Sequence, residues 1–196
     1  FTAIQADLSH QDAIADIVAK AVSAMGRVDI LVNNAGTIRR ADALTFSEKE
    51  WDDVLNLNLK SVFFLSQAVA RQFIEQGSGG KIINIASMLS FQGGIRVPSY
   101  TASKSGVLGL TRLMANEWAG QNINVNAIAP GAIKTHALST VLTPEIEQAM
   151  LKHTPLGRLG QPEDIARAAL FLCSPAASWV SGQVLTVSGG GVQELD

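Results

Sequence analysis

Short apolar runs of strand length alternate in this chain with longer segments whose apolar residues recur at helical spacing. Strands are predicted at residues 2–6, 28–33, 81–86, 124–129 and 183–187. Most of these runs are apolar on both faces, which is typical of strands buried in a parallel sheet. The alternation predicts an α/β fold in which a doubly wound parallel sheet is covered by helices.

Helix signals fall between the predicted strands. Residues 12–25 form an amphipathic pattern, and residues 47–50, Ser-Glu-Lys-Glu, match a capping box at the start of a long helix. Residues 143–144 and 161–162 each place a proline after a polar residue and before a carboxylate, as at many helix starts. Because the chain has 196 residues and neither a repeat nor a linker, we expect one domain over residues 1–196.

Composition and charge limit the classes of partner. Hydrophobic residues make up 47% and charged residues 16% of the chain, which is typical of a globular protein. A net charge of -2 without a basic run gives no electrostatic footprint for nucleic acid, and no apolar run reaches the roughly 20 residues that span a bilayer. The one cysteine, Cys173, cannot form an internal disulfide, which suits a reducing compartment. We therefore expect a cytoplasmic protein with no nucleic-acid partner, no membrane partner and no metal site.

The chain has one tyrosine, Tyr100, and Lys104 follows it four positions later. Residues at this spacing share one face of a helix, so the ammonium of Lys104 can lie near the phenol. A free phenol has a pKa of about 10, and a neighbouring cation favours the phenolate, which makes Tyr100 a usable general acid or base. The spacing alone favours a packing or surface role, and only the surrounding motifs favour chemistry.

Small and polar residues follow several of the predicted strands. Ser87 comes directly after the third strand, the run NNAG at residues 33–36 closes the second, and the pair PG at residues 130–131 follows the fourth. The carboxyl ends of strands are where open α/β sheets gather their ligands. Asn58 lies among leucines in a predicted helix, so its side chain needs a partner if it is buried. These positions predict a ligand crevice at one end of the sheet.

Five motifs occur in a fixed order along the chain. They are NNAG at 33–36, NLNLKSVFF at 56–64, IINIAS at 82–87, SYTASK at 99–104 and NAIAPG at 126–131. In these motifs and their order, the chain resembles the short-chain dehydrogenase/reductase family over its whole length. The resemblance implies a Rossmann-like fold of three layers, α/β/α, and hydride transfer between a nicotinamide cofactor and a secondary alcohol or ketone.

The same resemblance implies a set of site residues. Tyr100 would exchange a proton with the substrate oxygen, which Ser87 would orient. Lys104 would lower the pKa of the phenol and bind the nicotinamide ribose, while Asn58 would hold a water in a proton relay. The implied cofactor-binding residues are Asp7, Asn33, Ala35, Gly36, Tyr100, Lys104, Pro130, Gly131, Ile133 and Thr135. Asp7 as a cap of the following helix and Thr135 as a plain loop hydroxyl remain as alternatives.

The resemblance also implies a segment that this sequence does not contain. Family members have a strand, a glycine-rich TGxxxGxG turn, a helix, and a second strand and helix ahead of the position matched by Phe1, so we expect an N-terminally truncated sheet. The missing turn presents backbone amides to a pyrophosphate, and the missing second strand carries the residue that selects between cofactors. The expected cofactor is therefore NAD or NADP. The alternative is an inactive remnant that keeps the fold and its oligomer surfaces but does not bind the cofactor.

The predicted strand at residues 28–33 would then lie at an unpaired sheet edge, and such edges recruit partners. We expect residues 2–6 to pair with it through a right-handed crossover, or another chain to supply the pairing. Family members commonly form dimers or tetramers through the helices that begin near Ser47 and Pro98 and through the C-terminal strand. The resemblance therefore implies a homo-oligomer.

Two parts of the chain resemble different branches of the family. Residues from about 38 to 131 resemble members that act on sugar acids, and residues from about 132 onward resemble members that act on 7α-hydroxysteroids. Arg39, Arg40 and Arg96 could hold the carboxylate of a sugar acid, with solvated surface positions as the alternative.

Residues 134–153 resemble the family's substrate lid. The apolar residues of this segment, which would suit a steroid or would equally pack against the core, are Ala137, Leu138, Val141 and Leu142.

Overall fold

The computed structural model describes residues 1–140 and 142–191. Its strands form one parallel sheet in the order β1-β2-β3-β4, which confirms the predicted sheet. Their bounds are β1 Ile30–Asn33, β2 Gly80–Ile85, β3 Ile123–Pro130 and β4 Val184–Val187. Because neighbouring strands run in the same direction, the chain must cross back over the sheet between them, and helices make these crossings.

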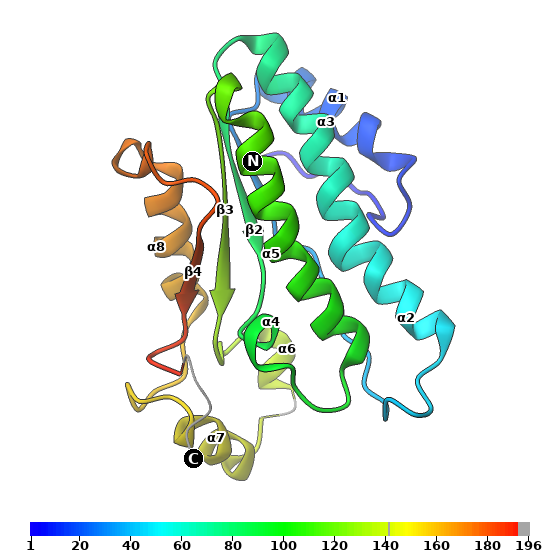
Figure 1. Ribbon diagram of the computed structural model, residues 1–196, viewed down its shortest axis with the longest axis vertical. Coiled ribbons are helices and arrows are strands. Elements are labelled where there is room, and N and C mark those ends of the chain that lie inside the picture. The colour runs from blue at the N-terminus through cyan, green and yellow to red at the C-terminus, as the bar shows by residue number, and fades with distance from the viewer. Residues whose placement is uncertain (141, 192–196) are drawn as a thin grey trace.

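Helices cover both faces of the sheet, so the three-layer α/β/α arrangement is confirmed (Figure 1). One face carries α1 Ala13–Met25, α3 Ser61–Gln76 and α5 Pro98–Trp118, and the other carries α8 Pro162–Cys173. The described chain also contains α2 Glu48–Leu55, α4 Leu89–Gln92, α6 His136–Ser139 and α7 Pro144–Lys152, with a π-helical turn η1 at Asn56–Lys60 and 3-10 turns η2 at Ala119–Gln121 and η3 at Pro175–Ala177. Of these helices, α4, α6 and α7 lie beyond the carboxyl ends of the strands (Figure 1).

The predicted helix starts are confirmed by their caps. Ser47 Oγ accepts a hydrogen bond from the Glu50 amide, and the Glu50 carboxylate accepts one from the Ser47 amide, which is the capping box expected from sequence. Thr143 Oγ1 accepts from the amide of Ile146 at the start of α7. The helix predicted from Ser47 is real, but the π-helical turn η1 divides it into α2 and α3.

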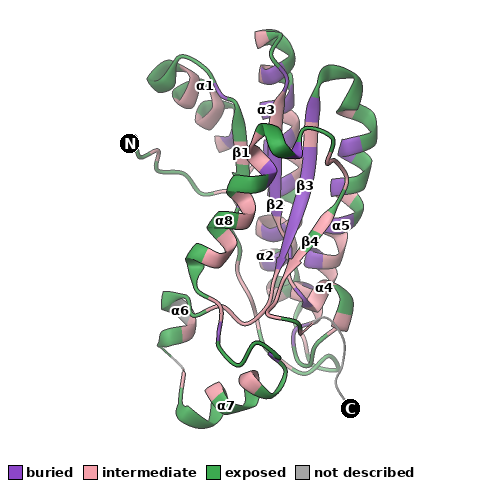
Figure 2. Ribbon diagram, turned by 90° about the vertical axis from the view of Figure 1, so that its left-hand side faces the viewer, coloured by how far each residue is buried: buried purple, intermediate pink, exposed green. Residues whose placement is uncertain are grey.

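Two apolar layers hold the helices on the sheet. Beneath α1, α3 and α5, the fully buried Phe73, Met114 and Val125 belong to one cluster, while Ile128 and Leu172 belong to another beneath α8. Figure 2 shows the burial concentrated on β2 and β3, the two central strands. Burial of each large side chain contributes about 1.5–3 kcal/mol, so these layers fix the strand ends relative to the helices. No helix within the described residues is long and apolar enough to cross a bilayer.

The strand predicted at residues 2–6 is wrong. Residues 1–7 have no regular structure, and within the described chain β1 pairs only with β2, so the predicted pairing of residues 2–6 with β1 is wrong as well. The run has one large apolar side chain, Ile4, and lies largely exposed, so it buries too little surface to form a sheet edge. Ile30 and Val32 on β1 are 47% and 45% exposed. Pairing of this edge with another chain stays a prediction.

Strand β1 begins two residues later than predicted, at Ile30 rather than Val28. The side chain of Gln76, at the end of α3, accepts a hydrogen bond from the Val28 amide at 3.0 Å and donates one to the Val28 carbonyl at 2.7 Å. These bonds satisfy the backbone of Val28 without a neighbouring strand.

Candidate active site

A cleft of about 600 Å³ opens at the carboxyl ends of the strands. Its lining includes eight residues that the sequence predicted for the site: Gly36, Ser87, Tyr100, Lys104, Pro130, Gly131, Ile133 and Thr135. Among the described residues that line the cleft, Lys104 is the one charged residue. The fold therefore brings together segments that are far apart in the sequence, from Asn34 to Ile165.

Tyr100 and Lys104 lie one turn apart near the start of α5, where Pro98 occupies the first helical turn. The Lys104 ammonium lies 5.8 Å from the centroid of the Tyr100 ring and donates a hydrogen bond of 2.6 Å to the carbonyl of Ile85 on β2. Lys104 is only 5% exposed. An ammonium has three donor hydrogens, so two remain for a ligand hydroxyl.

Ser87 follows β2 and is held on both sides by backbone bonds. The Ala86 amide donates to the carbonyl of Ile128, and the Met88 amide donates to the carbonyl of Pro130. These bonds fix the segment against β3. Ser87 Oγ accepts a hydrogen bond of 3.2 Å from the amide of Leu89. A hydroxyl that accepts in this way keeps its own proton to donate to a ligand oxygen.

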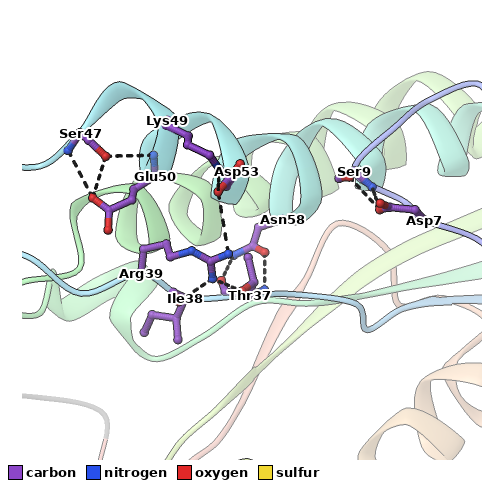
Figure 3. Close-up of polar contacts among 10 residues, drawn as sticks. All are labelled: Asp7, Ser9, Thr37, Ile38, Arg39, Ser47, Lys49, Glu50, Asp53 and Asn58. Carbon is purple, nitrogen blue, oxygen red and sulfur yellow. Dashed lines mark hydrogen bonds and ion pairs between the residues drawn. The ribbon is translucent and has the colours of Figure 1, made fainter.

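Asn58 lies in the π-helical turn η1 and is fully buried. Its Oδ1 accepts from the Thr37 amide at 2.8 Å, and its Nδ2 donates to the Thr37 carbonyl at 2.8 Å (Figure 3). The same Nδ2 donates to Ser103 Oγ at 3.3 Å. Asn58 therefore lies behind the cleft wall and fixes the loop that follows β1. A π-helical turn inside an α-helix is a common feature of functional sites.

Two glycines let the segments that line the cleft lie close to neighbouring parts of the protein. A methyl group on Gly36 would lie 3.4 Å from Asn58 Oδ1 and 3.6 Å from Lys104 Nζ, and one on Gly131 would lie 2.7 Å from Ser188 Cα. The open cleft and the free donors of Lys104 fit a nicotinamide cofactor with its ribose hydroxyls.

Comparison with known proteins agrees with this chemistry. A family model described as enoyl-(acyl carrier protein) reductase matches residues 1–191. A 2-dehydro-3-deoxy-D-gluconate 5-dehydrogenase of Dickeya dadantii is 60% identical over 191 residues, which are 97% of this chain and 76% of that protein. The chain belongs to the short-chain dehydrogenase/reductase family.

Solved structures of this family share the fold. A structure described as a 2-deoxy-D-gluconate 3-dehydrogenase of Agrobacterium tumefaciens with bound NADP has a TM-score of 0.83 at 54% identity, over 91% of this chain and 74% of that one. A 7α-hydroxysteroid dehydrogenase complexed with NADH and 7-oxo glycochenodeoxycholic acid has a TM-score of 0.92 at 51% identity, over 98% of this chain and 75% of that one.

As a family member, this chain is an NAD(P)-dependent oxidoreductase, and either NAD or NADP fits as its cofactor. Nothing in these comparisons supports the alternative of an inactive remnant.

Three residues predicted to bind cofactor do not line the cleft. Asn33 is buried and donates to Ser66 Oγ at 2.9 Å and to Asn84 Oδ1 at 2.8 Å, so its side chain ties β1 to α3 and β2. Ala35 is exposed on the loop after β1 but is not among the lining residues. Asp7 lies in a separate hollow of about 380 Å³ that shares only Thr37 with the cleft.

The alternatives given for Asp7 and Thr135 are both wrong. Asp7 accepts hydrogen bonds from the amide and hydroxyl of Ser9, which lower the pKa of its carboxyl, while the residue at the start of α1 is Asp12 (Figure 3). The alternative that Asp7 caps the next helix is therefore wrong. Thr135 is more than a loop hydroxyl, because its Oγ1 accepts from the Leu138 amide and caps α6.

The arginines proposed to hold a carboxylate lie outside the cleft. Arg39 donates to Thr37 Oγ1 at 2.8 Å and lies 3.9 Å from Asp53, facing the hollow that contains Asp7 (Figure 3). Arg96 pairs with Asp42 at 3.1 Å, and Arg40 is exposed. Within the lid segment, Val141 and the side chain of Ala137 lie outside the described residues, and Leu138 is partly buried.

Sequence reasoning missed several residues that line the cleft. These are Asn34, Thr37, Ile38, Ile85, Ala86, Pro162 and Ile165. Asn34 stands inside the NNAG motif, which is a usable signal. Pro162 and Ile165 come from the start of α8, and only the packing of this helix across the sheet brings them to the strand ends.

Burial lowers the pKa of the Lys104 ammonium to about 8 from an ordinary value of 10.5. Between these two pH values the unfolded chain binds one more proton than the folded chain, so the free energy of unfolding should rise by about 1.4 kcal/mol per pH unit from this group. We expect the stability of the wild type, relative to Lys104→Met, to increase by about 1.5 kcal/mol between pH 8 and pH 9.5 in urea titrations, because the folded chain still binds part of the proton near pH 8. A difference that stays constant over this range would mean that the buried ammonium keeps its proton.

Proposed function

We propose that this chain catalyses hydride transfer between NAD or NADP and a secondary alcohol or its ketone, with Asn58, Ser87, Tyr100 and Lys104 as the residues responsible. The observation that carries the proposal is that Tyr100, Ser87 and the buried ammonium of Lys104 line one cleft at the strand ends. Bound NAD or NADP would accept or supply the hydride.

Each residue has a role that follows from its contacts. The Tyr100 phenol gives its proton to a ketone oxygen or takes one from an alcohol, and the Ser87 hydroxyl donates to the same oxygen. Lys104 stabilises the phenolate by its charge and donates to the ribose hydroxyls. Asn58 keeps the loop after β1 in place through both hydrogen-bonding groups of the Thr37 backbone.

The substrate that we propose is a sugar acid. The dehydrogenase that is 60% identical is named for such a substrate, and the polar residues Asn34, Thr37 and Thr135 are among those that line the cleft. A hydroxysteroid is the second candidate. The apolar Ile38, Ile133 and Ile165 in the same cleft support it, together with the 51% identity to a dehydrogenase solved with a bile acid.

We also propose a cytoplasmic homo-oligomer, a dimer or tetramer. Large apolar side chains near β4 support self-association, because Trp179 is 99% and Leu170 is 71% exposed. Sedimentation of the purified chain would contradict this proposal if only monomers were present.

Cofactor binding is the direct test of the proposed function. We expect NADH or NADPH to quench the fluorescence of the three tryptophans saturably with a Kd in the micromolar range, about -8 kcal/mol. Turnover assays with sugar acids and with bile acids then distinguish the two substrate classes. Absence of quenching up to millimolar concentrations of both cofactors would refute the proposal.

A further inference from the structure

Two hydroxyl side chains stand next to the Tyr100–Lys104 pair on α5. Thr101 and Ser105 follow Tyr100 and Lys104 by one residue each, so they form a second pair four residues apart on a neighbouring face of the helix. Both are partly buried. The proposed function gives roles to Tyr100 and Lys104 but none to Thr101 and Ser105.

One hydroxyl donates to a carbonyl of α4 and the other to the carbonyl of the residue that follows α4. Ser105 Oγ donates to the carbonyl of Ser90 at 3.1 Å, and Thr101 Oγ1 donates to the carbonyl of Gly93. The last carbonyls of any helix lack partners within it, and α4 has only four residues. The hydroxyls of α5 therefore bind α4 to α5 at two points, Ser90 and Gly93.

The start of α4 is bonded to Ser87. The Ser87 carbonyl accepts from the Ser90 amide at 3.0 Å, and Ser87 Oγ accepts from the Leu89 amide at 3.2 Å. A helix of one turn has little stability of its own, so its position depends on what it is bonded to. Ser87 and Tyr100 belong to different segments, and α4 connects them.

The loop that follows α4 has no regular secondary structure that would fix the position of α4. Gly93 and Gly94 have φ values of +87° and +81°, and the following Arg96 has a φ of +62°. A positive φ is costly for a residue with a side chain and persists where surrounding contacts impose it. The bond from Thr101 to Gly93 lies at the start of this loop.

We propose that Thr101 and Ser105 are positioning residues that fix Ser87 relative to Tyr100. This inference rests on the proposed function, since it assigns Ser87 and Tyr100 to one substrate oxygen. The two hydroxyls touch neither substrate nor cofactor and act through α4. Loss of both would leave Ser87 and Tyr100 in the cleft but would loosen their relative placement.

The test is the double variant Thr101→Val, Ser105→Ala, which removes both hydroxyls with little change in size. We expect kcat to fall by about 10- to 100-fold, because small misplacements of reacting groups are costly, while KM for NADH or NADPH stays within about twofold. Thr101→Ser with Ser105 intact should keep kcat within about threefold of the wild type, since it restores the donor. Unchanged kcat in the double variant would overturn the proposal.

A matched control removes hydroxyls of the same kind elsewhere. In Thr45→Val, Ser174→Ala, each lost hydroxyl donates at the surface to a carbonyl three residues earlier, that of Asp42 and that of Phe171. This control should keep the wild-type kcat. A loss equal to that of the double variant would show that the effect is general destabilisation and would overturn the proposal.

A second measurement separates this inference from the proposed function. Hydrogen exchange of the amides at residues 89–93 needs neither cofactor nor substrate, and we expect it to be at least about tenfold faster in the double variant, with β2 and β3 unchanged. If the wild type lacks turnover, the proposed function fails and exchange alone decides whether the hydroxyls hold α4. Unchanged exchange at these residues would overturn the positioning role whatever the activity.

Discussion

Replacement of Tyr100 by phenylalanine should lower kcat by about 10²–10⁴-fold and leave the fold almost unchanged. The variant keeps the ring and its packing and loses only the hydroxyl that exchanges the proton. Within the described residues the Tyr100 hydroxyl has no hydrogen bond to protein, so its removal leaves no buried partner unsatisfied. The substitution should therefore slow the chemical step without lowering the free energy of unfolding.

The measurement compares kcat, the Kd of NADH and the urea midpoint of the wild type and Tyr100→Phe. The chain has one tyrosine, so ultraviolet titration of the phenol reports this residue alone and its signal disappears in the variant. The phenol pKa of the wild type can therefore be followed with and without cofactor. Retained turnover in the variant would refute the role of Tyr100, and a loss of NADH affinity would assign it to binding instead.

Local patterns in the sequence predicted most of the elements that build the site. Apolar runs located β2, β3 and β4 within a residue or two, because buried parallel strands carry few polar residues. The capping box at Ser47 located the start of α2, since its two hydrogen bonds are formed by residues three apart. The spacing of Tyr100 and Lys104 predicted a shared helix face for the same reason.

Features that depend on distant parts of the chain were not predictable in this way. Residues 2–6 resemble a strand locally, but a strand forms only where a neighbour pairs with it, and none does so within the described chain. Arg39 was proposed to hold a substrate, yet its guanidinium bonds to Thr37, two residues away, and faces Asp53 on α2. The hydrogen-bond partner of Asn58 was likewise not predictable, because Thr37 is 21 residues earlier in the sequence.

Replacement of Asn58 by leucine should lower the free energy of unfolding by about 2–4 kcal/mol. Leucine is similar in size but neither donates nor accepts, so the amide and the carbonyl of Thr37 both lose their partner. Each unsatisfied backbone group costs about 1–3 kcal/mol. Urea titration of Asn58→Leu checks this, and Asn56→Leu in the same π-helical turn is the control, with an expected change within about 0.5 kcal/mol.

The same variant distinguishes two roles for Asn58. If its side chain serves to hold the loop after β1, Asn58→Leu should weaken NADH binding as well as stability, because Gly36 and Thr37 form a wall of the cleft. If it serves mainly to hold a water in a proton relay, kcat should fall while stability and the Kd of NADH remain those of the wild type. The two hydrogen bonds of 2.8 Å to the Thr37 backbone favour the first result. An intact fold with normal cofactor affinity would mean that these bonds are replaceable by water and that the amide acts in the chemical step.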